Sequence, residues 1–117
     1  MVLYEIDIQR LKEIQNYIES NLEKDLRIKI IAQHFRLTAH TLRRQFKVHT
    51  GVPVHHYILV QRMVRARELL LNRIMPVSEV ANAVGYHEIS TFSHAFSSYY
   101  GRSPNDCIKC GGEIEGN

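Results

Sequence analysis

The sequence predicts an all-α protein of seven helices in which one helical unit occurs twice. Apolar residues recur three and four positions apart along most of the chain, and no segment sustains the alternation expected of a strand. The segment 31–46, IAQHFRLTAHTLRRQF, recurs in altered form at 80–96 as VANAVGYHEISTFSHAF. Ala32 and Ala81 are 49 residues apart, and each copy is followed by a glycine at the same distance. The chain therefore contains two copies of one supersecondary unit.

The first copy is preceded by a helix expected over residues 7–23. Its apolar stripe consists of Leu11, Ile14, Ile18 and Leu22. A short second helix is expected over residues 28–35, followed by a turn at Leu37 and Thr38. The Thr38 hydroxyl is a suitable N-cap for a third helix, which runs to about residue 49. Gly51 is expected to end this helix in a left-handed conformation.

A fourth helix links the copies over residues 53–72, with Pro53 in its first turn. Its apolar positions are Tyr57, Val60, Val64 and the segment 67–71. Pro76 is expected to open the fifth helix in the same way, and Gly85 forms the turn after it. The buried side of the fifth helix consists of Val77, Val80, Ala81 and Val84.

The sixth helix is expected over residues 88–100, with Phe92 and Phe96 facing inward and Gly101 at its end. Ser103 and Pro104 are expected to cap a short last helix. The residues after it, 111–117, are expected to form a disordered tail.

Composition excludes several classes of protein. No apolar run approaches the roughly 18 residues needed to cross a bilayer, and the N-terminal sequence lacks the order of a signal peptide. A soluble cytoplasmic protein without a membrane partner is expected. Cys107 and Cys110 form one CxxC, but a structural zinc site needs four ligands and no second CxxC exists. We therefore expect two unpaired thiols, no metal and no cofactor.

The net charge of +3 conceals a strong segregation of charge. Residues 27–73 carry ten basic residues and one acidic residue, whereas residues 1–26 and 74–117 each have a net charge of −3. A segment of 47 residues at +9 indicates a polyanionic partner. The alternative is a solvated face that keeps the protein soluble.

A short helix, a tight turn and a second helix form a helix-turn-helix motif. Its two helices cross closely, which suits the small side chains of Ala32 and Ala81 and leaves the outer face of the second helix free for a major groove. The linking helix of about 20 residues spans about 30 Å, close to the roughly 34 Å of one DNA turn. Both motifs are therefore expected to reach successive major grooves.

Three segments together resemble the AraC/XylS transcription regulators: LTAHTLRRQFKVHTGVPVHHY, RMVRARELL and PVSEVANAVGYHEISTFSHAFSSYYGRSP. The resemblance implies a homeodomain-like, seven-helix bundle over residues 6–110. Its parts are a first helix-turn-helix at about 27–50, a linker helix at about 53–72 and a second helix-turn-helix at about 76–100. It implies sequence-specific binding of double-stranded DNA and regulation of transcription, most often activation. RNA polymerase is a candidate partner, and an effector would bind a separate domain absent from this chain.

Positions that match the family's recognition helices supply the candidate DNA contacts. The candidate base contacts are His40, Thr41, Arg43 and Arg44 in the first motif and Ile89, Ser90, Ser93 and His94 in the second. The candidate phosphate contacts are Arg36, Thr38 and Lys47. Arginine can bind guanine in a bidentate manner, so Arg43 and Arg44 are the first choices.

The second motif departs from the family pattern in its charge. Ser97 and Ser98 stand where the second recognition helix usually ends in a basic pair, and Glu88 near its start would repel phosphate. In the first motif Arg36 replaces the usual turn glycine and Gln45 replaces an apolar residue. Cys107 replaces an aromatic residue in the last helix. We therefore expect the first motif to dominate the affinity for DNA.

Two other functions remain open on the sequence alone. One is a helical protein-interaction module without catalysis, and the other is a cysteine-based acceptor of methyl groups in DNA repair. The chain is read as a monomer, since no heptad repeat supports a coiled coil. It is further read as the C-terminal part of a longer regulator, with a complete small regulator as the alternative.

Overall fold

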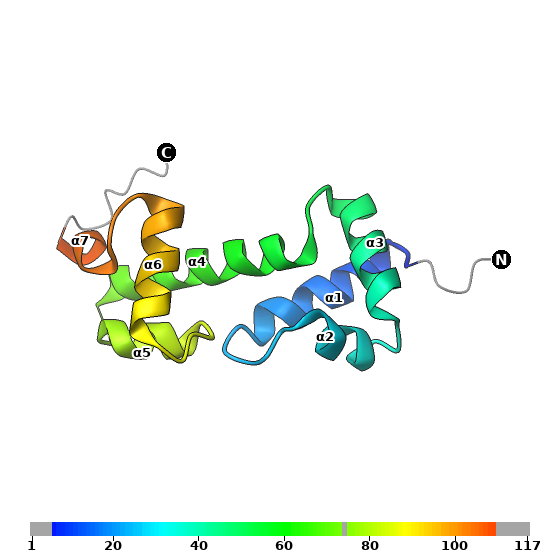
Figure 1. Cartoon of the computed structure of the whole chain (residues 1–117), viewed down its shortest axis with the longest axis horizontal. Helices are drawn as coiled ribbons and strands as arrows, with labels where there is room; N and C mark the ends of the chain where they lie inside the picture. The colour runs from blue at the N-terminus through cyan, green and yellow to red at the C-terminus, as the bar shows by residue number, and fades with distance from the viewer. Residues whose placement is uncertain (1–5, 74, 110–117) are drawn as a thin grey trace. The chain divides into compact units, whose positions relative to one another are not determined.

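The computed structural model describes residues 6–73 and 75–109, which fold into helices connected by short turns (Figure 1). The helices are α1 (Ile8–Ser20), α2 (Ile28–His34), α3 (Ala39–Thr50), α4 (Val54–Asn72), α5 (Val77–Ala83), α6 (Ile89–Tyr100) and α7 (Pro104–Lys109). These residues contain no strand, so the expected all-α fold of seven helices is confirmed. None of these helices combines the length and the hydropathy needed to cross a bilayer. The expected tail at 111–117 and Cys110 lie outside the described residues.

The chain divides into two compact units, with the boundary between Val60 and Gln61 inside α4. Each unit contains one helix-turn-helix motif: α2 and α3 in the first unit, α5 and α6 in the second. The helix before each motif belongs to the same unit, α1 in the first case and the second part of α4 in the other. Each motif therefore packs against a helix that precedes it in sequence.

The core of the first unit forms where α1 packs on the first motif. Ile14 and Ile18 are fully buried, as the apolar stripe of α1 predicts, whereas Leu11 is only partly buried. The other members of this core are Ile6, Leu22, Leu26, Ile31, Ala32, Leu42, Phe46, Val54 and Ile58. Burial of this apolar area is the main force that holds the short helices together, since isolated helices of seven residues are unstable in water.

The second unit has an equivalent core. Its buried residues are Met63, Ala66, Leu70, Val80, Ala81, Val84, Phe92, Phe96, Pro104 and Cys107. Cys107 lies on α7 with a fully buried side chain, so it belongs to the core and not to the tail of the chain. In the same unit the rings of Phe92, Phe96 and Tyr100 pack in a row, with centroids 5.8 Å and 4.8 Å apart.

The apolar positions expected for α4 are partly wrong. Val64 is 42% exposed, whereas Ile58 and Met63 are buried. Val54 and Ile58 are four residues apart and are buried in the first unit. Met63, Ala66 and Leu70 are buried in the second unit. The step of five residues from Ile58 to Met63 does not keep one helical face, so a single stripe does not describe this helix.

The ends of the helices follow the expected capping chemistry with small shifts. The Asp7 carboxylate accepts the Arg10 backbone N–H at 2.8 Å, and the Ser103 hydroxyl accepts the Asp106 N–H at 3.1 Å. Pro53 and Pro76 lie one residue before α4 and α5, not in their first turns. A proline tolerates this position because its missing N–H would have no partner inside the helix.

Candidate nucleic-acid interface

The backbones of the two motifs are built alike. The Leu37 N–H donates to the Ala32 carbonyl at 2.8 Å, and the Tyr86 N–H donates to the Ala81 carbonyl at 2.8 Å. Both alanines are 2% exposed, as expected where two helices cross closely. The repeat seen in the sequence is therefore a repeat of hydrogen bonding and packing.

The second turn is one residue longer than the first. Residues 35–38 separate α2 from α3, whereas residues 84–88 separate α5 from α6. Equivalent residues are thus 49 positions apart before the turn and 50 apart after it, with His87 as the extra residue. The helices α3 and α6 both contain 12 residues and both end at a glycine in a left-handed conformation. This register makes the outer positions of the two recognition helices directly comparable.

Arg36 occupies a backbone conformation that favours glycine. Its φ is +59°, and the equivalent residue of the second motif, Gly85, has a φ of +94°. A left-handed conformation costs an L-residue with a side chain about 1–2 kcal/mol. The Arg36 side chain is exposed at the turn, where the sequence analysis expects a phosphate contact. The structure thus places a strained cation beside α3.

The outer face of α3 is strongly basic. His40, Arg43, Arg44 and Lys47 are exposed and, together with Val48, line a shallow hollow of about 460 Å³. Within the described residues, no ion pair or hydrogen bond neutralises Arg43, Arg44 or Lys47. A face with uncompensated cations and a shallow hollow suits a polyanion.

Thr38 and Thr41 are committed to the start of α3. The Thr38 hydroxyl oxygen accepts the Thr41 N–H at 3.0 Å, which is the expected N-cap, and its O–H donates to the Thr41 hydroxyl oxygen at 2.9 Å. The Thr41 hydroxyl still has its own proton to donate. Of these two candidates, Thr41 is therefore the better hydrogen-bond donor toward a bound molecule.

The outer face of α6 is polar but carries no cation. Ile89, Ser90 and His94 are exposed and Ser93 is half-buried. In the register given above, Ser93, His94 and Ser97 correspond to Arg43, Arg44 and Lys47. The two recognition helices therefore share a backbone and differ in charge.

The start of α6 adds to this difference. Glu88 stands at the N-cap, where its exposed carboxylate makes no capping hydrogen bond. A negative charge near a helix N-terminus interacts favourably with the helix dipole. The same charge disfavours a nearby phosphate, which agrees with a weaker role for this helix in backbone binding.

Arginines from the preceding helices support both turns. Arg10 of α1 lies over the Phe35 ring with its guanidinium carbon 5.5 Å from the ring centre, and its Nη2 donates to the Phe35 carbonyl oxygen. Arg62 of α4 lies 5.9 Å from the centre of the Tyr86 ring. These contacts fix each turn against its own unit. They are not predictable from the sequence, because residues about 25 positions apart leave no local pattern.

Two residues at the candidate interface were also missed. Val48 is 68% exposed on the basic face of α3. A count of charged residues does not identify an apolar residue that lies among them. Thr91 is exposed on α6 in the position equivalent to Thr41. The equivalence of Thr91 and Thr41 is seen only when the extra turn residue is counted, which makes equivalent residues after the turn 50 positions apart.

Two observations bear on metal binding and on cysteine chemistry. Among the described residues, no group of three His, Cys, Asp or Glu side chains is placed to hold a metal ion. Cys107 is fully buried, so an alkylated base cannot reach its thiol in this fold. This burial argues against the methyl-acceptor function for Cys107.

Two equivalent helix-turn-helix motifs in one chain define a class of double-motif nucleic-acid-binding folds, and comparisons with known proteins agree. A family model described as a helix-turn-helix domain matches residues 31–109. The Msm operon regulatory protein of Streptococcus mutans serotype c is 33% identical over 107 residues, which cover 92% of this chain and 37% of that protein. The chain spans between 31% and 43% of the length of the first curated relatives it matches.

Solved structures give the same result. The C-terminal domain of AraT, a response regulator from Geobacillus stearothermophilus, has a TM-score of 0.82 and 31% identity, covering 86% of this chain and 84% of that one. An AraC-type regulator from Chromobacterium violaceum has a TM-score of 0.77 and 25% identity, covering 88% and 92%. The chain belongs to the AraC-type helix-turn-helix family, as the sequence resemblance predicts.

Proposed function

We propose that this chain is the DNA-binding part of a transcription regulator and that α3 supplies most of its affinity for double-stranded DNA. In this proposal α3 and α6 enter successive major grooves, with Arg43 and Arg44 reading base edges and Lys47 binding phosphate. The difference in charge between the outer faces of α3 and α6 is the observation that carries it. Phosphate contacts supply a large share of protein–DNA affinity, and of the two recognition helices α3 carries Arg and Lys whereas α6 carries neither.

The wider function follows from the family. We propose a non-catalytic regulator, most often an activator in this family, that contacts RNA polymerase and responds to an effector on a separate domain. Membership in the AraC-type family and the short span relative to the curated relatives support this proposal. A helical module that binds only proteins is the second candidate, and failure to bind any DNA at low salt would favour it.

Equivalent positions in α3 and α6 allow a matched experiment. A DNA site selected from a random pool is titrated with the wild-type chain, Lys47→Ala and Ser97→Ala at several salt concentrations. Lys47→Ala should reduce the slope of log affinity against log salt by about 0.9, the effect of one phosphate contact. Ser97→Ala should leave the slope unchanged, because a serine releases no counterion.

The reciprocal substitution makes the test stronger. Ser97→Lys introduces a cation at the position of Lys47 and should increase the slope by about 0.9 if α6 lies against the DNA backbone. Equal losses of affinity from Arg44→Ala and His94→Ala would contradict the dominance of the first motif. Circular dichroism of each variant is the control that the substitutions leave the helices intact.

A further inference from the structure

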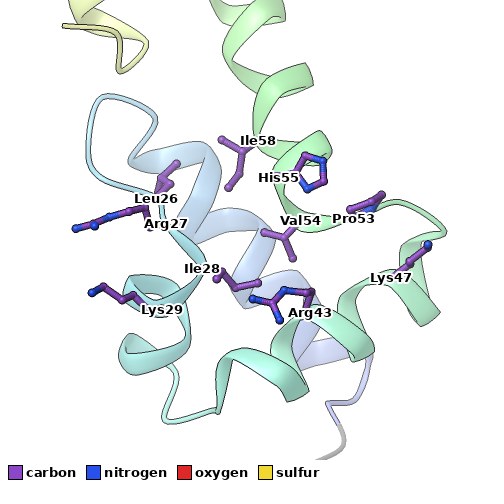
Figure 2. Close-up of a pocket in the computed structure, with 10 residues that line it drawn as sticks. All are labelled: Leu26, Arg27, Ile28, Lys29, Arg43, Lys47, Pro53, Val54, His55 and Ile58. Carbon is purple, nitrogen blue, oxygen red and sulfur yellow. The ribbon is translucent and has the colours of Figure 1, made fainter.

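A groove in the first unit lies beside the outer face of α3 (Figure 2). It has a volume of about 750 Å³ and is lined by the loop before α2, the start of α2, α3 and the first turns of α4. None of its described lining residues is acidic. A volume in the range of about 300–1,000 Å³ is typical of small-molecule sites.

The floor of the groove is apolar and firmly packed. Leu26, Val54 and Ile58 line it and also belong to the hydrophobic core, with exposed fractions of 6%, 2% and 7%. Ile28 and Pro53 complete the apolar lining. Because core packing holds these side chains in place, the floor exists before any ligand arrives, and a ligand needs no rearrangement of it.

The remaining lining of the groove is mostly basic, and its cations are not equivalent. Arg27 forms an ion pair with Asp25 at 2.8 Å, and its hydrogen bonds hold the pKa of that carboxyl below its usual range. Within the described residues, Lys29, Arg43 and Lys47 have no such partner. Figure 2 shows the Arg43 side chain extending from α3 toward Ile28. The groove thus combines an apolar floor with uncompensated positive charge.

We propose that the groove binds a small organic anion with an apolar body, a medium-chain carboxylate being the simplest example. Its head group pairs with Arg43, since arginine binds a carboxylate through two parallel hydrogen bonds, and Lys47 adds positive charge to the lining on the side of Pro53. Its body covers Ile28 and Val54. A DNA phosphate satisfies the cations but leaves the apolar floor in water, and a neutral apolar molecule leaves the cations unused. An amphipathic anion satisfies both parts of the site.

This ligand would compete with DNA. Arg43 and Lys47 are the residues to which the proposed function assigns DNA contacts, so this coupling rests on that function. A head group bound to Arg43 removes a base contact and neutralises part of the charge that attracts phosphate. The groove would give the DNA-binding unit a means of release by a small molecule.

Direct binding is tested without DNA. Octanoate, far below the concentrations at which it forms micelles, is titrated into the full chain while amide resonances are followed by NMR, with 1-octanol and acetate as matched probes. Saturable shifts centred on the groove are expected for octanoate, with about ten-fold weaker binding for octanol and for acetate. Octanol binding as tightly as octanoate, or shifts centred elsewhere, would overturn the proposal.

Variants locate the head group. The double variant Arg43→Gln with Lys47→Gln should weaken octanoate binding about ten-fold, a loss of about 1.4 kcal/mol, because the partner of the head group and a second positive charge of the lining are removed. Lys12→Gln removes an exposed cation of α1 outside the groove and should leave the affinity unchanged. Equal weakening by Lys12→Gln would mean that only general charge attraction had been measured.

Competition is tested with a selected DNA site at constant ionic strength. Octanoate should raise the apparent Kd for DNA by a factor of one plus the ratio of its concentration to its own Kd for the groove, whereas acetate at equal concentration should not. Groove binding without any change in DNA affinity would refute the coupling. A chain that binds octanoate but no DNA at all would instead overturn the proposed function. The NMR titration would still test whether the groove binds the ligand.

Discussion

Replacing Arg36 with glycine is expected to stabilise the first unit and to weaken DNA binding at the same time. Arg36 has a φ of +59°, in the region that the equivalent Gly85 occupies with +94°. The side chain of Arg36 makes no hydrogen bond or ion pair within the part of the chain that the structure describes. The backbone conformation therefore dominates the effect of this substitution on stability.

The magnitude follows from two opposing contributions. Glycine removes a strain of about 1–2 kcal/mol, the cost of a left-handed conformation for a residue with a side chain. It also increases the conformational entropy of the unfolded chain, which costs about 0.4–1 kcal/mol. The free energy of unfolding should therefore rise by up to about 1.6 kcal/mol, with a central value of about 0.8 kcal/mol that corresponds to about 3–6 °C in melting temperature for a unit of this size. Gly85→Ala is the mirror change and should lower the stability of the second unit by a similar amount.

Thermal unfolding followed by far-ultraviolet circular dichroism measures the first effect, and DNA titration against salt measures the second. Loss of one phosphate contact should reduce the salt slope by about 0.9. Arg36→Lys keeps both the strain and the charge, so it should change neither quantity. A lower melting temperature for Arg36→Gly would refute the strain argument. An unchanged salt slope would remove Arg36 from the phosphate contacts.

Two further predictions concern the interior. Burial, together with the hydrogen bond to the Glu19 carboxylate, raises the pKa of the Tyr57 phenol. The folded state thus holds the phenol proton more tightly than the unfolded chain does. The free energy of unfolding should therefore be greatest below about pH 10 and should decline at higher pH. Tyr57→Phe should reduce that decline, as measured by urea titrations at several pH values. The buried Cys107 should react with iodoacetamide far more slowly in the folded chain than in urea, as read from the mass of its own peptide; equal rates would reopen the methyl-acceptor hypothesis.

The sequence predicts those features that depend on local chemistry. The Thr38 cap, the glycine ends of α3 and α6 and the inward faces of Phe46 and Phe96 all follow from spacing and residue type, and the structure confirms them. These features are predictable because a helix fixes which residues share a face within a few positions. The positions of α3 that do not lie on its inward face must be exposed, so its exposed cations were predictable too.

The sequence does not predict features that depend on distant partners. The predicted set of buried positions in α4 was partly wrong. The two parts of this helix are buried in two separate units, whereas a periodicity search assumes one continuous buried face. The contact of Arg10 with Phe35 joins α1 to the turn after α2, and no local sequence pattern around either residue predicts it. The groove beside α3 depends on a loop and on three helices that meet only in the folded unit. The DNA contacts themselves stay predictions.

The two recognition helices can differ in role because packing constrains only their inner faces. A change at a buried position such as Phe92 costs several kcal/mol, whereas exposed substitutions usually change stability by about 0.5 kcal/mol or less. The outer face of α6 is therefore free to carry polar groups, Thr91 and His94 among them, that can hydrogen-bond base edges but add no Lys or Arg charge to attract phosphate.

We therefore expect α6 to contribute discrimination between sequences and little affinity. His94→Ala should change the base preference of one cluster of positions in a selected DNA pool while the salt slope stays constant. Arg44→Ala is the matched variant of α3 and should reduce affinity for every sequence as well as change preference. A His94→Ala chain that selects the same sequences as the wild type would show that α6 does not read the bases at this position.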